Sequence, residues 1–225
     1  MPVTDTALRD VYAAAVERMA GRALDALTGA GGAVAPAAPA STPELAALRV
    51  LGPDLFAAQL LSGAPLETAT TTALGAALRA FPPETPTPDG TDQDALAVAW
   101  LDHVSGFLAG VAVHQPEHVP DSSHWQRWSV RMARLAPLAL PGLDGPVHRA
   151  ARREPLALAR GTVRAMLRRD HRTALRLTRW LAWLGTPTPL ELPPLLDRLH
   201  LVGDGSNRTA LDLAITQALL TEHQR

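Results

Sequence analysis

The sequence predicts an all-α fold, an irregular multi-helix bundle of about nine or ten helices. The 225-residue chain contains 36 Leu and 14 Val but a single Ile, three Phe and one Tyr. Leu and Ala favour helices, whereas strands are enriched in β-branched and aromatic side chains. Apolar residues also recur at three- and four-residue spacing, and 20 prolines divide the chain into short segments.

The first predicted helix covers 5–27, where Leu8, Val11 and Ala15 share one face. Residues 29–42 are rich in Gly, Ala and Pro, and this segment is longer than most loops inside compact domains. We therefore expect three units. Residues 1–28 form an N-terminal helix able to act as a mobile or swapped arm, 29–42 form a linker, and 43–225 form the helical domain.

Helix-start and helix-stop residues predict the elements of the helical domain. Thr42 caps a helix that continues to about 62 and bends at Gly52-Pro53, and Pro137 is expected to shorten a later one. The segment 155–184 is either one long helix or two helices joined at Asp170, which would be a good N-cap. The other predicted helices lie at 66–81, 91–114, 122–140, in a short segment before 154, at 195–201 and in a last segment ending near 222.

Two absences exclude several classes of protein. The chain has no Cys, which excludes disulfides, thiolate nucleophiles and cysteine-ligated metal sites. It also has no Lys, which excludes Schiff-base enzymes and the phosphate loop of nucleotide hydrolases. Because no serine-nucleophile motif is present either, we expect a non-enzymatic protein without a cofactor.

The N-terminus and the apolar runs bear on localisation. The N-terminus lacks the cationic start and apolar stretch of a signal peptide. No uninterrupted apolar run reaches the roughly 20 residues that span a bilayer. The expectation is a cytoplasmic protein without a transmembrane segment.

Charge is divided unevenly along the chain. Residues 1–120 contain 5 Arg and 13 acidic residues, a net charge of −8, whereas residues 121–225 contain 16 Arg and 9 acidic residues, a net charge of +7. The basic segment 127–179 alone has a net charge of +10. The overall net charge is only −1, so this segregation is the main functional clue.

The basic segment contains a candidate anion-binding site. If 155–184 is one helix, arginines at every fourth position form a positive stripe along it. Four tryptophans, Trp125, Trp128, Trp180 and Trp183, lie nearby in the sequence and could stack on bases. The leading hypothesis is therefore a regulatory or binding protein that engages a polyanion, most plausibly nucleic acid (DNA or RNA). The predicted anion-binding residues are Arg152, Arg153, Arg160, Arg164, Arg168, Arg172 and Arg176.

Other interpretations of these features stay open. The arginines could form a solvated face, or the basic half could pack on the acidic half within one chain. The same acidic-to-basic packing between chains would make a homo-oligomeric scaffold, for example a homodimer. A metal-dependent helical enzyme is a further alternative, with His103, His114, Glu117 and His118 as ligands, although Pro116 argues against a helix through the last three.

Overall fold

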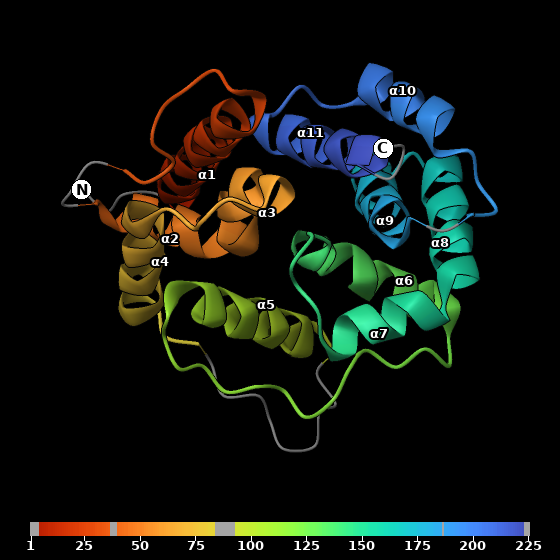
Figure 1. Cartoon of the computed structure of the whole chain (residues 1–225), viewed down its shortest axis with the longest axis horizontal. Coiled ribbons are helices and arrows are strands. Elements are labelled where there is room, and N and C mark those ends of the chain that lie inside the picture. Colours follow the sequence, from red (N-terminus) through yellow and green to blue (C-terminus); the bar gives the residue numbers. More distant parts are fainter. Residues whose placement is uncertain (1–4, 37–39, 84–92, 186, 223–225) are drawn as a thin grey trace.

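The computed structural model describes residues 5–36, 40–83, 93–185 and 187–222 (Figure 1). Across these ranges every regular element is a helix, which confirms the predicted all-α class. The elements, in chain order, are α1 (Asp5–Thr28), α2 (Thr42–Leu51), the 3-10 helix η1 (Gly52–Phe56), α3 (Ala57–Ser62), α4 (Thr68–Ala80), α5 (Gln93–Ala109), α6 (Trp125–Arg134), the 3-10 helix η2 (Ala136–Leu138), α7 (Pro146–Arg153), α8 (Pro155–Leu167), α9 (His171–Leu184), α10 (Leu192–Val202) and α11 (Asn207–Glu222).

Helix α9 is the central element of the fold. It packs against α6, α8, α10 and α11, and nearly all of its second half is buried. Trp180 of α9 and Trp128 of α6 are fully buried, as is Phe56 of η1. Burying one large apolar side chain contributes about 1.5–3 kcal/mol. The core around α9 therefore positions α6 and α8, the two helices that form the candidate site.

Helix α1 packs on its own chain. Ala15, Met19 and Ala23 are buried, and α1 lies against α2 and α11 (Figure 1). A carboxylate oxygen of Glu17 accepts a hydrogen bond from the backbone nitrogen of Asn207 at 2.7 Å. Exchange of α1 between two chains, as a swapped arm, stays a prediction.

The segment 42–62 contains the bend that the sequence predicts. Helix α2 ends at Leu51, Gly52 has φ = 51°, and the chain continues through η1 into α3. The N-cap of α2 is Ser41, one residue before the predicted Thr42. The Glu44 carboxylate accepts a hydrogen bond from the Ser41 backbone nitrogen at 2.9 Å, which satisfies one free donor at the helix start.

The same segment is long and apolar enough, by length and composition, to cross a membrane. Half of its most apolar window is buried inside the protein. Buried core helices share this property with membrane spans, so the segment is weak evidence for a membrane location.

The structure decides between one helix and two in the segment 155–184. Helix α8 ends at Leu167, Arg169 has φ = 59°, and α9 begins at His171. A carboxylate oxygen of Asp170 accepts a hydrogen bond from the backbone nitrogen of Thr173 at 3.1 Å. Asp170 is therefore the N-cap of a separate helix, and the arrangement with one continuous helix is wrong.

Two predicted helices end earlier in the structure. The helix predicted to reach 114 ends at Ala109, where Gly110 has φ = 65° and the Val111 nitrogen bonds the Gly106 oxygen at 2.8 Å. The helix predicted to reach 140 ends at Arg134, followed by η2, which contains Pro137. The predicted start of the helix over 91–114 lies outside the described residues.

Candidate anion-binding groove

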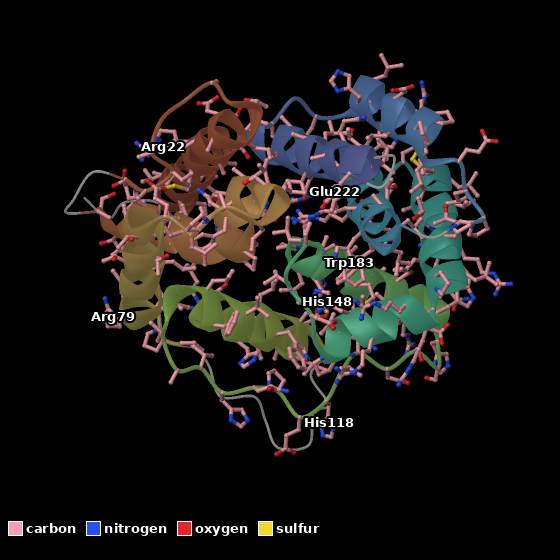
Figure 2. The ribbon with its side chains drawn as sticks, viewed as in Figure 1. Arg22, Arg79, His118, His148, Trp183 and Glu222 are labelled. Atoms are coloured by element: carbon pink, nitrogen blue, oxygen red, sulfur yellow. The ribbon has the colours of Figure 1, made fainter. Side chains whose placement is uncertain are left out.

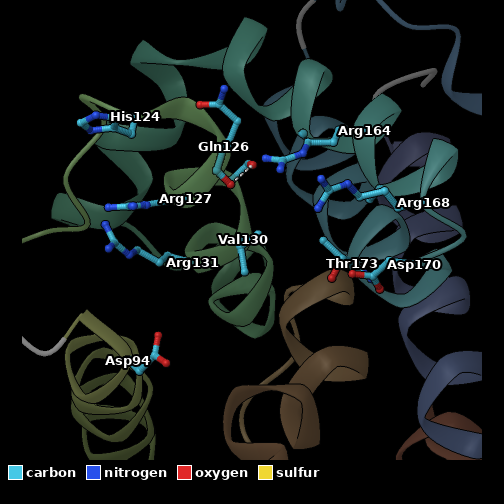
Figure 3. A pocket seen from close by; sticks show the side chains of 13 residues that line it. Asp94, His124, Gln126, Arg127, Val130, Arg131, Arg164, Arg168, Asp170 and Thr173 are labelled. Atoms are coloured by element: carbon cyan, nitrogen blue, oxygen red, sulfur yellow. Dashed lines mark hydrogen bonds between the residues drawn. The ribbon is translucent and has the colours of Figure 1, made fainter.

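A surface hollow of about 550 Å³ lies between α6, α8 and the start of α9. Four arginines line it in two pairs, each pair spaced by one helical turn: Arg127 and Arg131 on α6, and Arg164 and Arg168 at the end of α8. Figure 3 shows the two pairs on either side of Gln126 and Val130. We call this hollow, with its four arginines, the basic groove.

The groove forms where α6 and α8 pack together. Gly161 of α8 lies against Ser129 of α6, and a Cβ atom at Gly161 would overlap the Ser129 side chain. Both residues line the groove. The absence of a side chain at Gly161 therefore allows the close approach that brings the two arginine pairs to one site.

The four groove arginines keep their positive charge uncompensated. Within the ranges that the structure describes, none of them forms an ion pair. Arg127 and Arg168 are exposed, whereas Arg131 and Arg164 are half-buried. The guanidinium carbon of Arg164 lies 6.0 Å from the centre of the Trp125 ring. Clustered cations in a hollow concentrate positive potential and attract anions.

The two carboxylates that line the groove already have partners. Asp94 of α5 pairs with Arg134, and Asp170 caps α9 through the Thr173 backbone. The carboxylates therefore do not neutralise the groove arginines by direct ion pairing.

The predicted stripe of five arginines is not continuous. The break at Asp170 places Arg160, Arg164 and Arg168 before a turn and Arg172 and Arg176 after it. Arg172 lines a separate hollow of about 230 Å³ next to α10. The stripe hypothesis depended on one continuous helix and is therefore wrong.

Arg176 and Arg179 of α9 belong to the interior of the protein. The Nε atom of Arg176 is 3.5 Å from a carboxylate oxygen of Asp212. Arg179 is fully buried and pairs with both Asp54 and Asp212. Arg208 lies near this network, and burial, reinforced by the charges of Arg176 and Arg172, lowers its pKa. Arg176 and Arg179 are paired with carboxylates in the interior and are unavailable to a ligand.

The remaining predicted residues lie away from the groove. Arg152 pairs with Asp144 at 3.0 Å, and its guanidinium lies 4.8 Å from the centre of the Trp183 ring. Arg153 and Arg160 are exposed, but neither lines the groove. Of the seven predicted anion-binding residues, Arg164 and Arg168 are the two that the structure brings into it.

Most of the predicted tryptophan platform is inside the protein. Trp128 and Trp180 are fully buried, and the indole nitrogen of Trp180 donates to the Met132 oxygen at 2.7 Å. Trp183 is half-buried and donates to the Leu140 oxygen at 3.2 Å. Burial therefore excludes base stacking by Trp128 and Trp180, and the Arg152 guanidinium already lies over the Trp183 ring. Trp125 is half-buried and contacts the groove arginine Arg164.

Arg127 and Arg131 line the groove but are not among the seven predicted anion-binding residues. Their four-residue spacing indicates a shared face, which lies about 100° around the helix from the face of the buried Trp128 and Met132. Their proximity to Arg164, however, depends on the packing of α6 on α8 and is not visible in the sequence.

The four residues of the alternative metal site do not come together. His114, Glu117 and His118 are exposed in the loop after α5, and the His103 Nδ1 atom is 3.1 Å from the Val113 oxygen. Among the residues described, no group of three or more His, Asp or Glu side chains could hold a metal ion. The metal-enzyme alternative has no support from this arrangement.

Comparison with models of known protein families, with curated proteins and with solved structures gives no match to this chain. The inference of function therefore rests on the geometry and charge of the groove.

Proposed function

We propose that this chain is a non-enzymatic helical protein that binds nucleic acid in the basic groove. The observation that carries the proposal is the convergence of four arginines without ion pairs on one hollow of about 550 Å³. A guanidinium presents planar, paired donors that match phosphate oxygens and keeps its charge at any physiological pH.

The groove favours a sequence-independent mode of binding. Trp125 does not itself line the groove, but its half-buried ring lies beside the groove arginine Arg164 and is the aromatic surface we propose for a stacked base. Because Trp128 and Trp180 are fully buried and Trp183 is half-buried beneath the Arg152 guanidinium, contacts with phosphates are expected to dominate the affinity. This favours a flexible single strand, which can follow the groove with its backbone and place one base on Trp125.

The four groove arginines support binding rather than catalysis, and the other titratable side chains of the lining are His124, Asp94 and Asp170. Guanidinium groups do not exchange protons near neutral pH, so the four arginines cannot act as general acids or bases. The groove carboxylates of Asp94 and Asp170 are occupied by Arg134 and by the α9 cap. What the groove offers a ligand is therefore positive charge.

Salt-dependent binding tests the proposal. Fluorescence anisotropy would follow a labelled oligothymidylate of about 20 nucleotides, with a duplex of equal length as comparison. We expect log K to fall linearly with log salt concentration. Replacing Arg127 and Arg131 by Gln should reduce the magnitude of that slope by about 1.4, since each lost phosphate contact accounts for about 0.7 on a single strand.

A matched control variant distinguishes the loss of groove arginines from the loss of positive charge elsewhere on the protein. Arg153→Gln with Arg198→Gln removes the same charge from exposed positions outside the groove and should leave the slope nearly unchanged. Absence of binding at low salt, a flat salt dependence, or equal losses in the two double variants would each overturn the proposal.

A further inference from the structure

A second cavity, separate from the basic groove, lies between α5 and the segment that leads into α7. Its volume is about 380 Å³, within the range of small-molecule sites. The walls are mostly apolar and include Trp100, Val104 and Phe107 of α5 together with Leu143 and Val147. Two histidines, His103 and His148, also line it, and we call it the histidine pocket.

His148 lines this pocket and has one ring nitrogen that is free to accept a hydrogen bond. The side chain is only 2% exposed, and its Nε2 atom is 2.8 Å from the Leu138 carbonyl oxygen. A carbonyl oxygen can only accept, so Nε2 carries the hydrogen and Nδ1 of the neutral ring carries a lone pair. The Nδ1 atom has no hydrogen-bond partner among the residues that the structure describes.

The orientation of the His148 ring is fixed by aromatic packing. Figure 2 shows His148 beside Trp183, and the centres of these two rings are 5.0 Å apart. The centre of the Trp180 ring lies 5.5 Å from that of His148. Both contacts have tilted or edge-on geometry, which aromatic pairs prefer. The ring therefore cannot turn to present Nε2 to the pocket without losing the Leu138 bond.

His103 has the same kind of arrangement on the opposite wall. Its Nδ1 atom is 3.1 Å from the Val113 carbonyl oxygen, which leaves Nε2 of the neutral ring as an acceptor. The ring stands edge-on to Trp100, with the centres 5.8 Å apart. An apolar pocket that carries two acceptors is suited to a ligand with hydrogen-bond donors.

Asp144 is the acidic residue that lines the histidine pocket, and it does not require a cationic ligand. Asp144 accepts hydrogen bonds from Arg152 at 3.0 Å and from the Gly145 backbone nitrogen at 2.8 Å. These donors hold the pKa of Asp144 below its ordinary value and balance its charge. The ligand is therefore expected to be neutral.

We infer that the histidine pocket binds a neutral aromatic molecule of one or two fused rings that donates a hydrogen bond to Nδ1 of His148. The rings would lie against Trp100 and Phe107, and the donor would satisfy a polar atom that is otherwise unpaired in a largely apolar pocket. The inference is independent of the proposed nucleic-acid binding, because the two hollows share no lining residue.

Isothermal titration with two related probes tests the donor requirement. 2-Naphthol carries a hydroxyl donor, whereas 2-methoxynaphthalene has the same rings without the donor. We expect 2-naphthol to bind about tenfold more tightly, as one additional hydrogen bond would give. Equal affinity for the two probes, or no binding of 2-naphthol up to its solubility limit, overturns the inference.

A substitution at an exposed residue tests where 2-naphthol binds without destabilising the fold. Phe107 is 74% exposed, so Phe107→Ala should leave the protein folded and weaken 2-naphthol binding several-fold. Leu201, which is 76% exposed on α10 and outside the pocket, provides the control Leu201→Ala. Equal affinity of the wild type and both variants would place the probe elsewhere and overturn the inference. The Arg127→Gln, Arg131→Gln variant should bind 2-naphthol like the wild type.

Discussion

Arg179 and Asp54 are 125 residues apart in the chain and form a 2.7 Å ion pair in the interior of the protein. Arg179 also lies 3.0 Å from a carboxylate oxygen of Asp212 and donates to the Ala139 oxygen at 3.3 Å. Burial raises the pKa of Asp54, while the neighbouring guanidinium acts in the opposite direction. This network connects η1, α9 and α11 and joins the acidic half of the chain to the basic half.

Removing Arg179 is expected to destabilise the fold strongly. Arg179→Met leaves the carboxylates of Asp54 and Asp212 buried without their main counter-charge, and breaking such a pair typically costs about 3–5 kcal/mol. Urea unfolding would measure the change in the free energy of unfolding. The control Arg198→Met lies on an exposed position of α10 and should change it little. A comparable loss in both variants would contradict a structural role for the network.

The stability of the protein is expected to depend on pH through His148. Burial lowers the pKa of His148 below its ordinary value of 6.5. Between that value and the lower folded-state pKa, the unfolded chain binds a proton that the folded chain does not. This contribution is therefore fully present above the ordinary pKa and is lost as the pH falls below it. Urea unfolding at about pH 7.5 and about pH 5.5 would detect the loss.

The variant His148→Gln separates this effect from other titrations. Its free energy of unfolding should depend less on pH than that of the wild type over the same interval, whereas His200→Gln, at an exposed position, should behave like the wild type. An unchanged pH dependence in His148→Gln would show that other groups cause it.

Asp170→Ala tests the cap that separates α8 from α9. The substitution removes the acceptor for the Thr173 backbone nitrogen and should lower the free energy of unfolding by about 1 kcal/mol. Asp197→Ala, at an exposed position within α10, removes the same charge without removing a cap and serves as the control in urea unfolding. Equal stability of the two variants would contradict the capping role.

Gly161→Ala tests the close packing of α6 on α8. A Cβ atom at this position overlaps the Ser129 side chain, and such overpacking typically costs about 1–3 kcal/mol. Adding Ser129→Gly removes the overlapping atoms. A double-mutant cycle on the free energy of unfolding should therefore give a favourable coupling. Strict additivity of the two substitutions would show that the helices do not meet at these residues.

The fold class and several element ends could be predicted because their causes are local. An excess of Leu over Ile, frequent Pro and a capping Asp170 act through the backbone of their own segment. The early end of α5 was missed, since the tight reversal after Gly110 depends on Gly106, which leaves space for the side chain of Val113.

The candidate site was predicted less well because its residues meet through tertiary packing. Arg179 was counted as part of the basic segment. Its spacing from Leu175 and Ala182, four and three residues, nevertheless places it on the apolar side of α9. Its partners Asp54 and Asp212 come from distant segments, and no local pattern reveals them. Arg127 and Arg164 line the same groove from two different helices, and their proximity likewise depends on tertiary packing.

The contact between Glu17 of α1 and Asn207 of α11 spans 190 residues, and this bears on the order of folding. During synthesis, α1 can meet α2 early, but the surface that covers its other side is made last. Closing so large a loop is slow compared with forming local helix pairs. Until α11 arrives, the apolar face of α1 is open to solvent and to other chains, which makes this the stage at which a growing chain is most exposed to misassembly.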